Sequence, residues 1–131
     1  MSVNVPISIG ELWDKYTILL IKKEKVKDEK KIIYILNEIE NLETLMTLFS
    51  FKNNNLFLNL QKVNLELWDI EDKLRIKEKE NIFDNEFIEL ARSVYYTNDK
   101  RAEIKKEINI LFNSQFYEVK DYVDYKNNYY S

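Results

Sequence analysis

The sequence contains no cysteine and no histidine, and it has one glycine and one proline in 131 residues. Without cysteine there is no disulfide scaffold, no thiolate nucleophile and no thiolate-ligated zinc or iron-sulfur centre. Without histidine there is no Ser-His-Asp triad and no His-ligated metal. One glycine cannot build the phosphate-cradling loop of a P-loop or dinucleotide-binding protein. These absences restrict any catalysis to charge stabilisation or to carboxylate-bound Mg²⁺.

The two strong helix breakers lie at the start of the chain. Pro6 and Gly10 fall within the first ten residues, and neither residue type occurs again. Long helices are therefore favoured, with turns made by other residue types. The length suits one domain with one hydrophobic core.

The charge balance and the apolar runs exclude two kinds of partner. Lys and Arg number 20 against 23 Asp and Glu, which gives a net charge of -3, so we expect no nucleic-acid partner. The longest apolar run, residues 32–36, is far too short to span a bilayer, and the start of the chain lacks the order of a signal peptide. We therefore expect a cytoplasmic protein with no membrane partner.

Four apolar stripes at 3-4 spacing predict four helices. Ser8 and Glu11 fit a capping box at the start of the first helix, which is expected to end near Val26. Asp28 suits the N-cap of the second helix, and Asp84 suits that of the fourth.

Two asparagine-containing segments, residues 53–55 and 81–85, predict the turns that flank the third helix. Short connections between helices of similar length predict an all-α fold, an antiparallel up-down four-helix bundle over residues 1–113. Residues 114–131 lose the periodicity, so we expect a short C-terminal tail in which Tyr122 and Tyr125 are packed.

The first helix has more apolar residues than one seam needs. Ile18 and Ile21 lie off that seam. Either the fourth helix or the tail covers them, or a second copy does so in a homodimer.

The apolar stripe of the fourth helix is interrupted by Thr97 and Arg101. Polar residues on a flank of the third helix are expected at the same level, and together they predict a pocket for a small anionic ligand. The alternative is a closed core network in which Arg101 pairs with Glu71. The candidate ligand-binding residues are Asn64, Trp68, Glu71, Arg75, Asn98, Arg101 and Lys105.

A carboxylate site is a weaker alternative. Glu40 and Glu43 on the second helix and Glu66 and Asp69 on the third are similar to the Mg²⁺-binding pairs of the all-α nucleoside triphosphate pyrophosphohydrolases. Acid pairs at this spacing are common in a chain so rich in acids, and the heptad register directs the two pairs to opposite flanks. We therefore expect no metal site and no cofactor, with Mg²⁺ as the alternative.

A further alternative is an enzyme like the helical chorismate mutases. Those enzymes stabilise a dianionic transition state with cations and a Glu or Gln inside a helical bundle. Glu71, Arg75, Arg101 and Lys105 are residues of the right types.

Three parts of the chain carry a family resemblance: SIGELWDKYTIL (residues 8–19), LWDIEDKLR (67–75), and LARSVY with TNDKRA (90–95 and 97–102). They resemble a small bacterial and phage protein family known as a domain of unknown function. The resemblance implies a stand-alone domain of this length and no established activity. Asp14 and Lys15, within the first segment, are further candidates, although their heptad positions favour a surface role.

The sequence thus predicts a helical binding or assembly module. The alternative is an enzyme or sensor for a phosphorylated or carboxylated metabolite.

Overall fold

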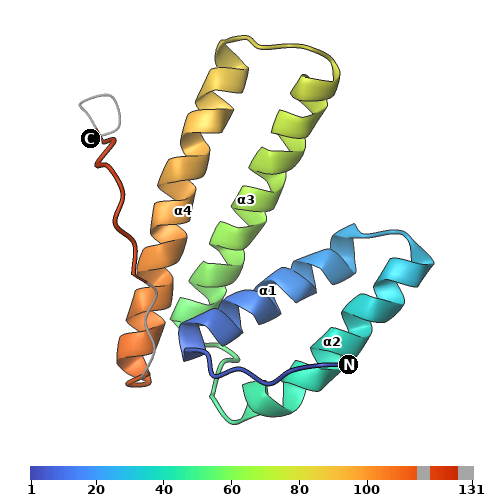
Figure 1. The fold of residues 1–131 in the computed structure, drawn as a ribbon, viewed down its shortest axis with the longest axis vertical. Coiled ribbons are helices and arrows are strands. Elements are labelled where there is room, and N and C mark those ends of the chain that lie inside the picture. Colours follow the sequence, from blue (N-terminus) through green and yellow to red (C-terminus); the bar gives the residue numbers. More distant parts are fainter. Residues whose placement is uncertain (115–118, 127–131) are drawn as a thin grey trace.

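The computed structural model describes residues 1–114 and 119–126, and these form an all-α four-helix bundle (Figure 1). The predicted fold class is confirmed, and no strand occurs among the described residues. The helices are α1 (Ile9–Lys25), α2 (Glu29–Thr47), α3 (Asn55–Lys79) and α4 (Asn85–Leu111).

The helices begin at the predicted caps. Ser8 accepts a hydrogen bond from the Glu11 amide at 3.1 Å, and Asp28 accepts one from the Lys30 amide at 2.9 Å. Asp84 caps α4 in the same way. Only half of the predicted capping box forms, because the Glu11 carboxylate binds Lys105 instead of turning back to Ser8. This carboxylate is therefore drawn into a tertiary contact.

Asparagine adopts the left-handed backbone conformation that glycine usually adopts after a helix. Asn81 and Asn113 directly follow the C-caps of α3 and α4 with φ values of 56° and 50°, and Asn53, in the loop before α3, has a φ of 62°. Asparagine tolerates this left-handed conformation better than other non-glycine residues. The helices can therefore end in a chain whose only glycine is Gly10.

The four helices form two antiparallel hairpins, α1–α2 and α3–α4 (Figure 1). Helix α1 contacts each of the other three helices, whereas α2 contacts no other helix than α1. The α3–α4 hairpin extends beyond the α1–α2 hairpin in Figure 1. The most enclosed helix is therefore α1.

Aromatic side chains of α1, α3 and the end of α4 make the centre of the core. Trp13 is fully buried. Its ring meets the rings of Phe57 and Phe112 edge to face, with centroids 5.5 and 5.2 Å apart. Such pairs add about 1 kcal/mol each to the burial of apolar area.

Burial decreases along the α3–α4 hairpin. Leu60 and Leu67 are buried, Leu74 is half-buried, and Phe83 and Ile88 beyond it are exposed. The cause is that α1 covers only one end of the hairpin, where α3 begins and α4 ends (Figure 1). A regular apolar stripe in the sequence therefore does not mean equal burial along it.

The two isoleucines of α1 that lie off its seam differ in burial. Ile21 is buried within the chain at 5 % exposure, and Ile18 is half-buried. No helix within the described parts of the chain is long and apolar enough to cross a membrane.

The described part of the predicted tail, residues 119–126, runs along α4 without regular structure. Tyr125 is half-buried and Tyr122 is exposed, although both contact α4. The rest of the predicted tail after Ser114, residues 115–118 and 127–131, lies outside the described residues.

Candidate functional site

Helix α1 brings a carboxylate into the interior of the bundle. Asp14 is 1 % exposed, so the expected surface role of this residue is wrong. The heptad argument assumed one buried face on α1, but α1 packs on three helices and buries residues on several sides. Lys15, its neighbour, is exposed as expected and lies 4.0 Å from Glu38 on α2.

Both carboxylate oxygens of Asp14 accept hydrogen bonds from Arg101 on α4. Arg101 donates from Nε to Oδ1 at 2.9 Å and from a terminal nitrogen to Oδ2. Asn64 on α3 donates to Oδ1 at 2.9 Å, and also to the Thr17 hydroxyl at 2.8 Å. The Thr17 hydroxyl in turn donates to the Asp14 carbonyl at 2.8 Å. A bidentate guanidinium is among the strongest partners that a carboxylate can have.

Lys105, one turn further along α4, adds a second cation. It is 7 % exposed, and its Nζ donates to Glu11 at 2.8 Å and lies 3.6 Å from Asp14. Two carboxylates of α1 thus face two cations of α4. We call this set the polar cluster: Glu11, Asp14, Thr17, Asn64, Arg101 and Lys105.

The polar cluster holds Asp14 in its ionised form. Burial raises the pKa of Asp14, but the hydrogen bonds from Arg101 and Asn64 and the charges of Arg101 and Lys105 outweigh burial. The pKa of Asp14 therefore lies below its ordinary value of 3.8.

The start of α1 is fastened to the end of α4. The Gly10 amide donates to the Asn109 side chain at 2.7 Å, and the Ile9 amide donates to the Ser114 hydroxyl at 3.2 Å. A Cβ on Gly10 would lie 2.6 Å from the Lys105 carbonyl oxygen and 2.8 Å from the Asn109 side chain. Only glycine allows this close approach, which sets the distance between α1 and the cations of α4.

The predicted ligand-binding residues divide into three groups. Asn64, Arg101 and Lys105 meet in the polar cluster as neighbours of Asp14. Trp68 and Asn98 are half-buried on α3 and α4 and are not members of the polar cluster.

Glu71 and Arg75 form the third group. They pair with each other at 3.6 Å on α3, and both are exposed. The predicted pairing of Arg101 with Glu71 is therefore wrong, because Asp14 occupies the guanidinium. The four residues named for a chorismate-mutase-like site are likewise divided, with Arg101 and Lys105 turned to α1.

The four acidic residues of the weaker alternative are spread over the surface. Glu40, Glu43, Glu66 and Asp69 are all exposed, and their helices α2 and α3 do not contact each other. Asp69 lies 3.8 Å from Lys25 on α1. Within residues 1–114 and 119–126, no group of three or more acidic side chains lies together in a way that could hold a metal ion.

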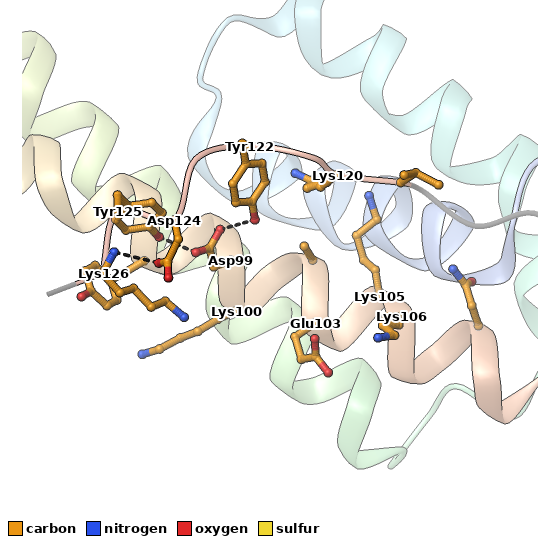
Figure 2. Close-up of a pocket in the computed structure, with 14 residues that line it drawn as sticks. Asp99, Lys100, Glu103, Lys105, Lys106, Lys120, Tyr122, Asp124, Tyr125 and Lys126 are labelled. Atoms are coloured by element: carbon orange, nitrogen blue, oxygen red, sulfur yellow. Dashed lines mark hydrogen bonds between the residues drawn. The ribbon is translucent and has the colours of Figure 1, made fainter. Parts of the chain in front are cut away.

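A cavity of about 1100 Å³ lies between α4 and residues 119–126, next to the polar cluster (Figure 2). Lys105 and Asn109 belong to its wall, so the cavity adjoins the junction of α1 and α4. Its described lining contains five lysines, against three carboxylates, in a chain of net charge -3. These lysines are Lys100, Lys105, Lys106, Lys120 and Lys126.

The lysines of the cavity come from two separate segments. Lys105 and Lys106 lie on α4, and Lys120 lies on the tail. Figure 2 shows the side chain of Lys105 extending from α4 toward the tail, on which Lys120 lies. Ammonium groups donate hydrogen bonds to phosphate and carboxylate oxygens, so this wall suits an anion.

No family model matches this sequence, and neither a curated protein nor a solved structure matches it. The resemblance to an uncharacterised bacterial and phage family stays a prediction.

The sequence did not single out Glu11, Asp14 or Asn109 as the partners of the α4 cations. Asp14 and Glu11 carry one signal that could have found them: they lie within four residues of Gly10, the only glycine in the sequence, in the first turns of α1. A glycine inside a helix often marks a close helix contact, and polar residues beside it then face the neighbouring helix.

Proposed function

We propose that the protein is a cytoplasmic binding module for a small anionic ligand, phosphorylated or carboxylated, which occupies the cavity between α4 and residues 119–126. The observation that carries this proposal is the convergence of lysines from α4 and from the tail on one cavity of about 1100 Å³. A chain of net charge -3 has no general attraction for anions, so the local excess of cations is a specific feature of this surface.

The polar cluster supports the proposal by orienting one of these cations. Glu11 and Asp14 hold the Lys105 ammonium from the side of α1, while the side chain of Lys105 also forms part of the cavity wall. Holding a donor in place before the ligand arrives reduces the entropy lost on binding. Lys106 and Lys120 add positive charge that the ligand meets at the same wall.

The tyrosines of the cavity suit the same class of ligand. Tyr96, Tyr122 and Tyr125 belong to the lining, where their rings add apolar surface beside the lysines. Ligand sites typically combine such apolar surface with a few polar groups that fix orientation. The proposed activity is binding, carried by charge and hydrogen bonds.

Calorimetric titration of the purified chain with inorganic phosphate, and separately with pyrophosphate, tests this proposal. We expect binding that weakens as salt is added, because exposed charges are screened. The double variant Lys106→Gln, Lys120→Gln should bind about tenfold or more weakly, since each charge-assisted hydrogen bond contributes about 1.5–3 kcal/mol.

The matched control is Lys62→Gln, Lys73→Gln, which removes two exposed lysines of α3 and changes the net charge equally. This control should bind as the unchanged chain does. Absence of binding to either anion, or an equal loss of affinity in the control variant, would overturn the proposed function.

A further inference from the structure

Two tyrosine hydroxyls attach the tail to a single side chain of α4. Tyr122 donates to Oδ1 of Asp99 at 2.6 Å, and Tyr125 donates to Oδ2 of the same carboxylate. We call these three residues the Asp99 latch. Because each oxygen receives its own hydroxyl, one carboxylate fixes two points of the tail (Figure 2).

Ring contacts extend the attachment at the same end of the cavity. The Tyr125 ring packs against Tyr95 and Tyr96 of α4, with centroids 5.3 and 5.5 Å apart. The Lys126 ammonium lies 5.9 Å from the centre of the Tyr96 ring. Residues 122–126 are thus attached to α4, and residues 119 and 120 form cavity wall beside this attachment.

The protonation states of Asp99 and Tyr125 at neutral pH favour the hydrogen bonds of the Asp99 latch. Burial raises the pKa of Asp99, but the hydrogen bonds from Tyr122 and Tyr125 and the charges of Lys126 and Lys120 lower it below its ordinary value. Burial and the Asp99 carboxylate both raise the pKa of Tyr125. The carboxylate is therefore ionised and accepts, while the phenol stays protonated and donates.

Resting on the proposed function, we infer that residues 119–126 are a strap over the anion cavity and that the Asp99 latch holds this strap closed. Asp99 is then a positioning residue: it acts on the ligand by keeping Lys120 in the cavity wall. An anion that contacts both Lys120 and α4 binds the closed strap more tightly than the open one. The coupling is reciprocal. If docking of the strap raises the affinity for the ligand by a given factor, the bound ligand raises the docking equilibrium of the strap by the same factor.

Hydrogen exchange of residues 119–126 and phosphate titration, both on the full chain, test this inference. The variants are Asp99→Asn and the double variant Tyr122→Phe, Tyr125→Phe, and the matched control is Tyr34→Phe on α2, where the tyrosine is exposed. Tyr122 is itself 55 % exposed, so loss of its hydroxyl leaves the core intact.

In both latch variants we expect exchange of the strap amides to become about threefold to tenfold faster, the range for one or two hydrogen bonds, with exchange in α1 unchanged. Phosphate affinity should fall by a similar factor. Phosphate should slow strap exchange in the unchanged chain, and Tyr34→Phe should alter neither quantity.

The outcomes separate this inference from the proposed function. Unchanged strap exchange in the latch variants would overturn the latch, and faster exchange with unchanged phosphate affinity would overturn the coupling, while the lysine variants still support the anion site. Absence of phosphate binding in the unchanged chain would overturn the proposed function and, with it, the role of the strap.

Discussion

A carboxylate that is 1 % exposed must find enough partners in the interior to replace water, and Asp14 finds them on two neighbouring helices. Asn64 supplies an amide donor from α3, and Arg101 supplies a bidentate guanidinium from α4. Removing a partner of Asp14 should therefore strongly lower the stability of the fold. Three predictions at the scale of single residues follow from the surroundings of Asp14 and from the close helix contact beside it.

Arg101→Met should lower the free energy of unfolding by about 3 kcal/mol, because it leaves the buried Asp14 carboxylate without its bidentate partner. The further change Asp14→Leu in the same chain should restore part of this loss, since no buried charge then remains unpaired. Urea unfolding followed by circular dichroism measures both. Arg75→Met, which removes an exposed cation on α3, is the control and should cost less than about 0.5 kcal/mol. An equal cost for Arg101→Met and Arg75→Met would contradict the role given to Asp14.

The stability that Asp14 contributes should be lost in acid. The folded-state pKa of Asp14 lies below its ordinary value of 3.8, so the unfolded chain takes up the proton first as pH falls. The contribution is therefore complete above about pH 5 and decreases as pH falls through the lowered folded-state pKa. Urea unfolding at several pH values should show the unchanged chain losing its advantage over Asp14→Asn below about pH 4. An advantage that is constant down to pH 2 would show that Asp14 does not titrate with folding.

Gly10→Ala should destabilise the fold although alanine favours helices. The added Cβ would lie 2.6 Å from the backbone oxygen of Lys105, which cannot move without shifting α4. Overpacking of this kind costs about 1–3 kcal/mol. Thermal unfolding of Gly10→Ala measures this effect, with Asn37→Ala on the exposed face of α2 as the control. A variant more stable than the unchanged chain would show that α1 and α4 can separate slightly at no cost.

At the scale of elements, side chains next to each helix decide where it starts and ends. Four asparagine or aspartate caps and turn residues, Asp28, Asn53, Asn54 and Asn81, were identified from residue type and position, because capping depends on local hydrogen bonds. The burial of the helices was harder to predict. The stripe of α3 continues through Leu74 with unchanged spacing, but α1 covers only the first part of it.

Asn54→Ala should lower the free energy of unfolding by about 1 kcal/mol, the usual cost of losing an N-cap. The Asn54 side chain accepts from the amides of Leu56 and Phe57 at 2.9 and 3.3 Å, and alanine leaves these amides without that acceptor. Urea unfolding provides the measurement. Asn41→Ala within the exposed part of α2 serves as the control and should be neutral or slightly stabilising, because alanine favours a helix interior. Equal effects of the two changes would contradict the capping role.

At the scale of the whole molecule, α1 lies at the centre of the contacts and the tail covers one side of α4. The sequence left two alternatives for Ile18 and Ile21: cover by the fourth helix or the tail, or a homodimer through the first helix. Ile21 is covered by the chain itself, which leaves the half-buried Ile18 as the apolar part of that face.

Light scattering tests the homodimer alternative. If α1 is the interface, the unchanged chain should scatter with twice the mass of 15.9 kDa, and Ile18→Lys should return it to the single-chain mass. Ile33→Lys, which alters an exposed isoleucine of α2, is the control and should not change the mass. The single-chain mass for all three proteins would contradict a dimer through α1.

The sequence by itself determined the class of fold and the ends of the helices. Helix periodicity, caps and turn residues are local properties that depend on residues at most four positions apart, and they are present before any tertiary contact forms. The near absence of glycine and proline added to this, because it left asparagine as the residue that follows α3 and α4 in the left-handed conformation.

Only the tertiary structure decided which polar residues meet. Arg101 and Lys105 were identified as unusual from the interrupted stripe, but their partners Asp14 and Glu11 lie 87 and 94 residues away in the chain. A helical repeat specifies the direction of a side chain around its own axis and not which helix packs there. The cavity depends in the same way on the path of residues 119–126 over α4, which no periodic pattern describes. The polar cluster and the anion cavity therefore became visible only once the helices and the tail were placed in space.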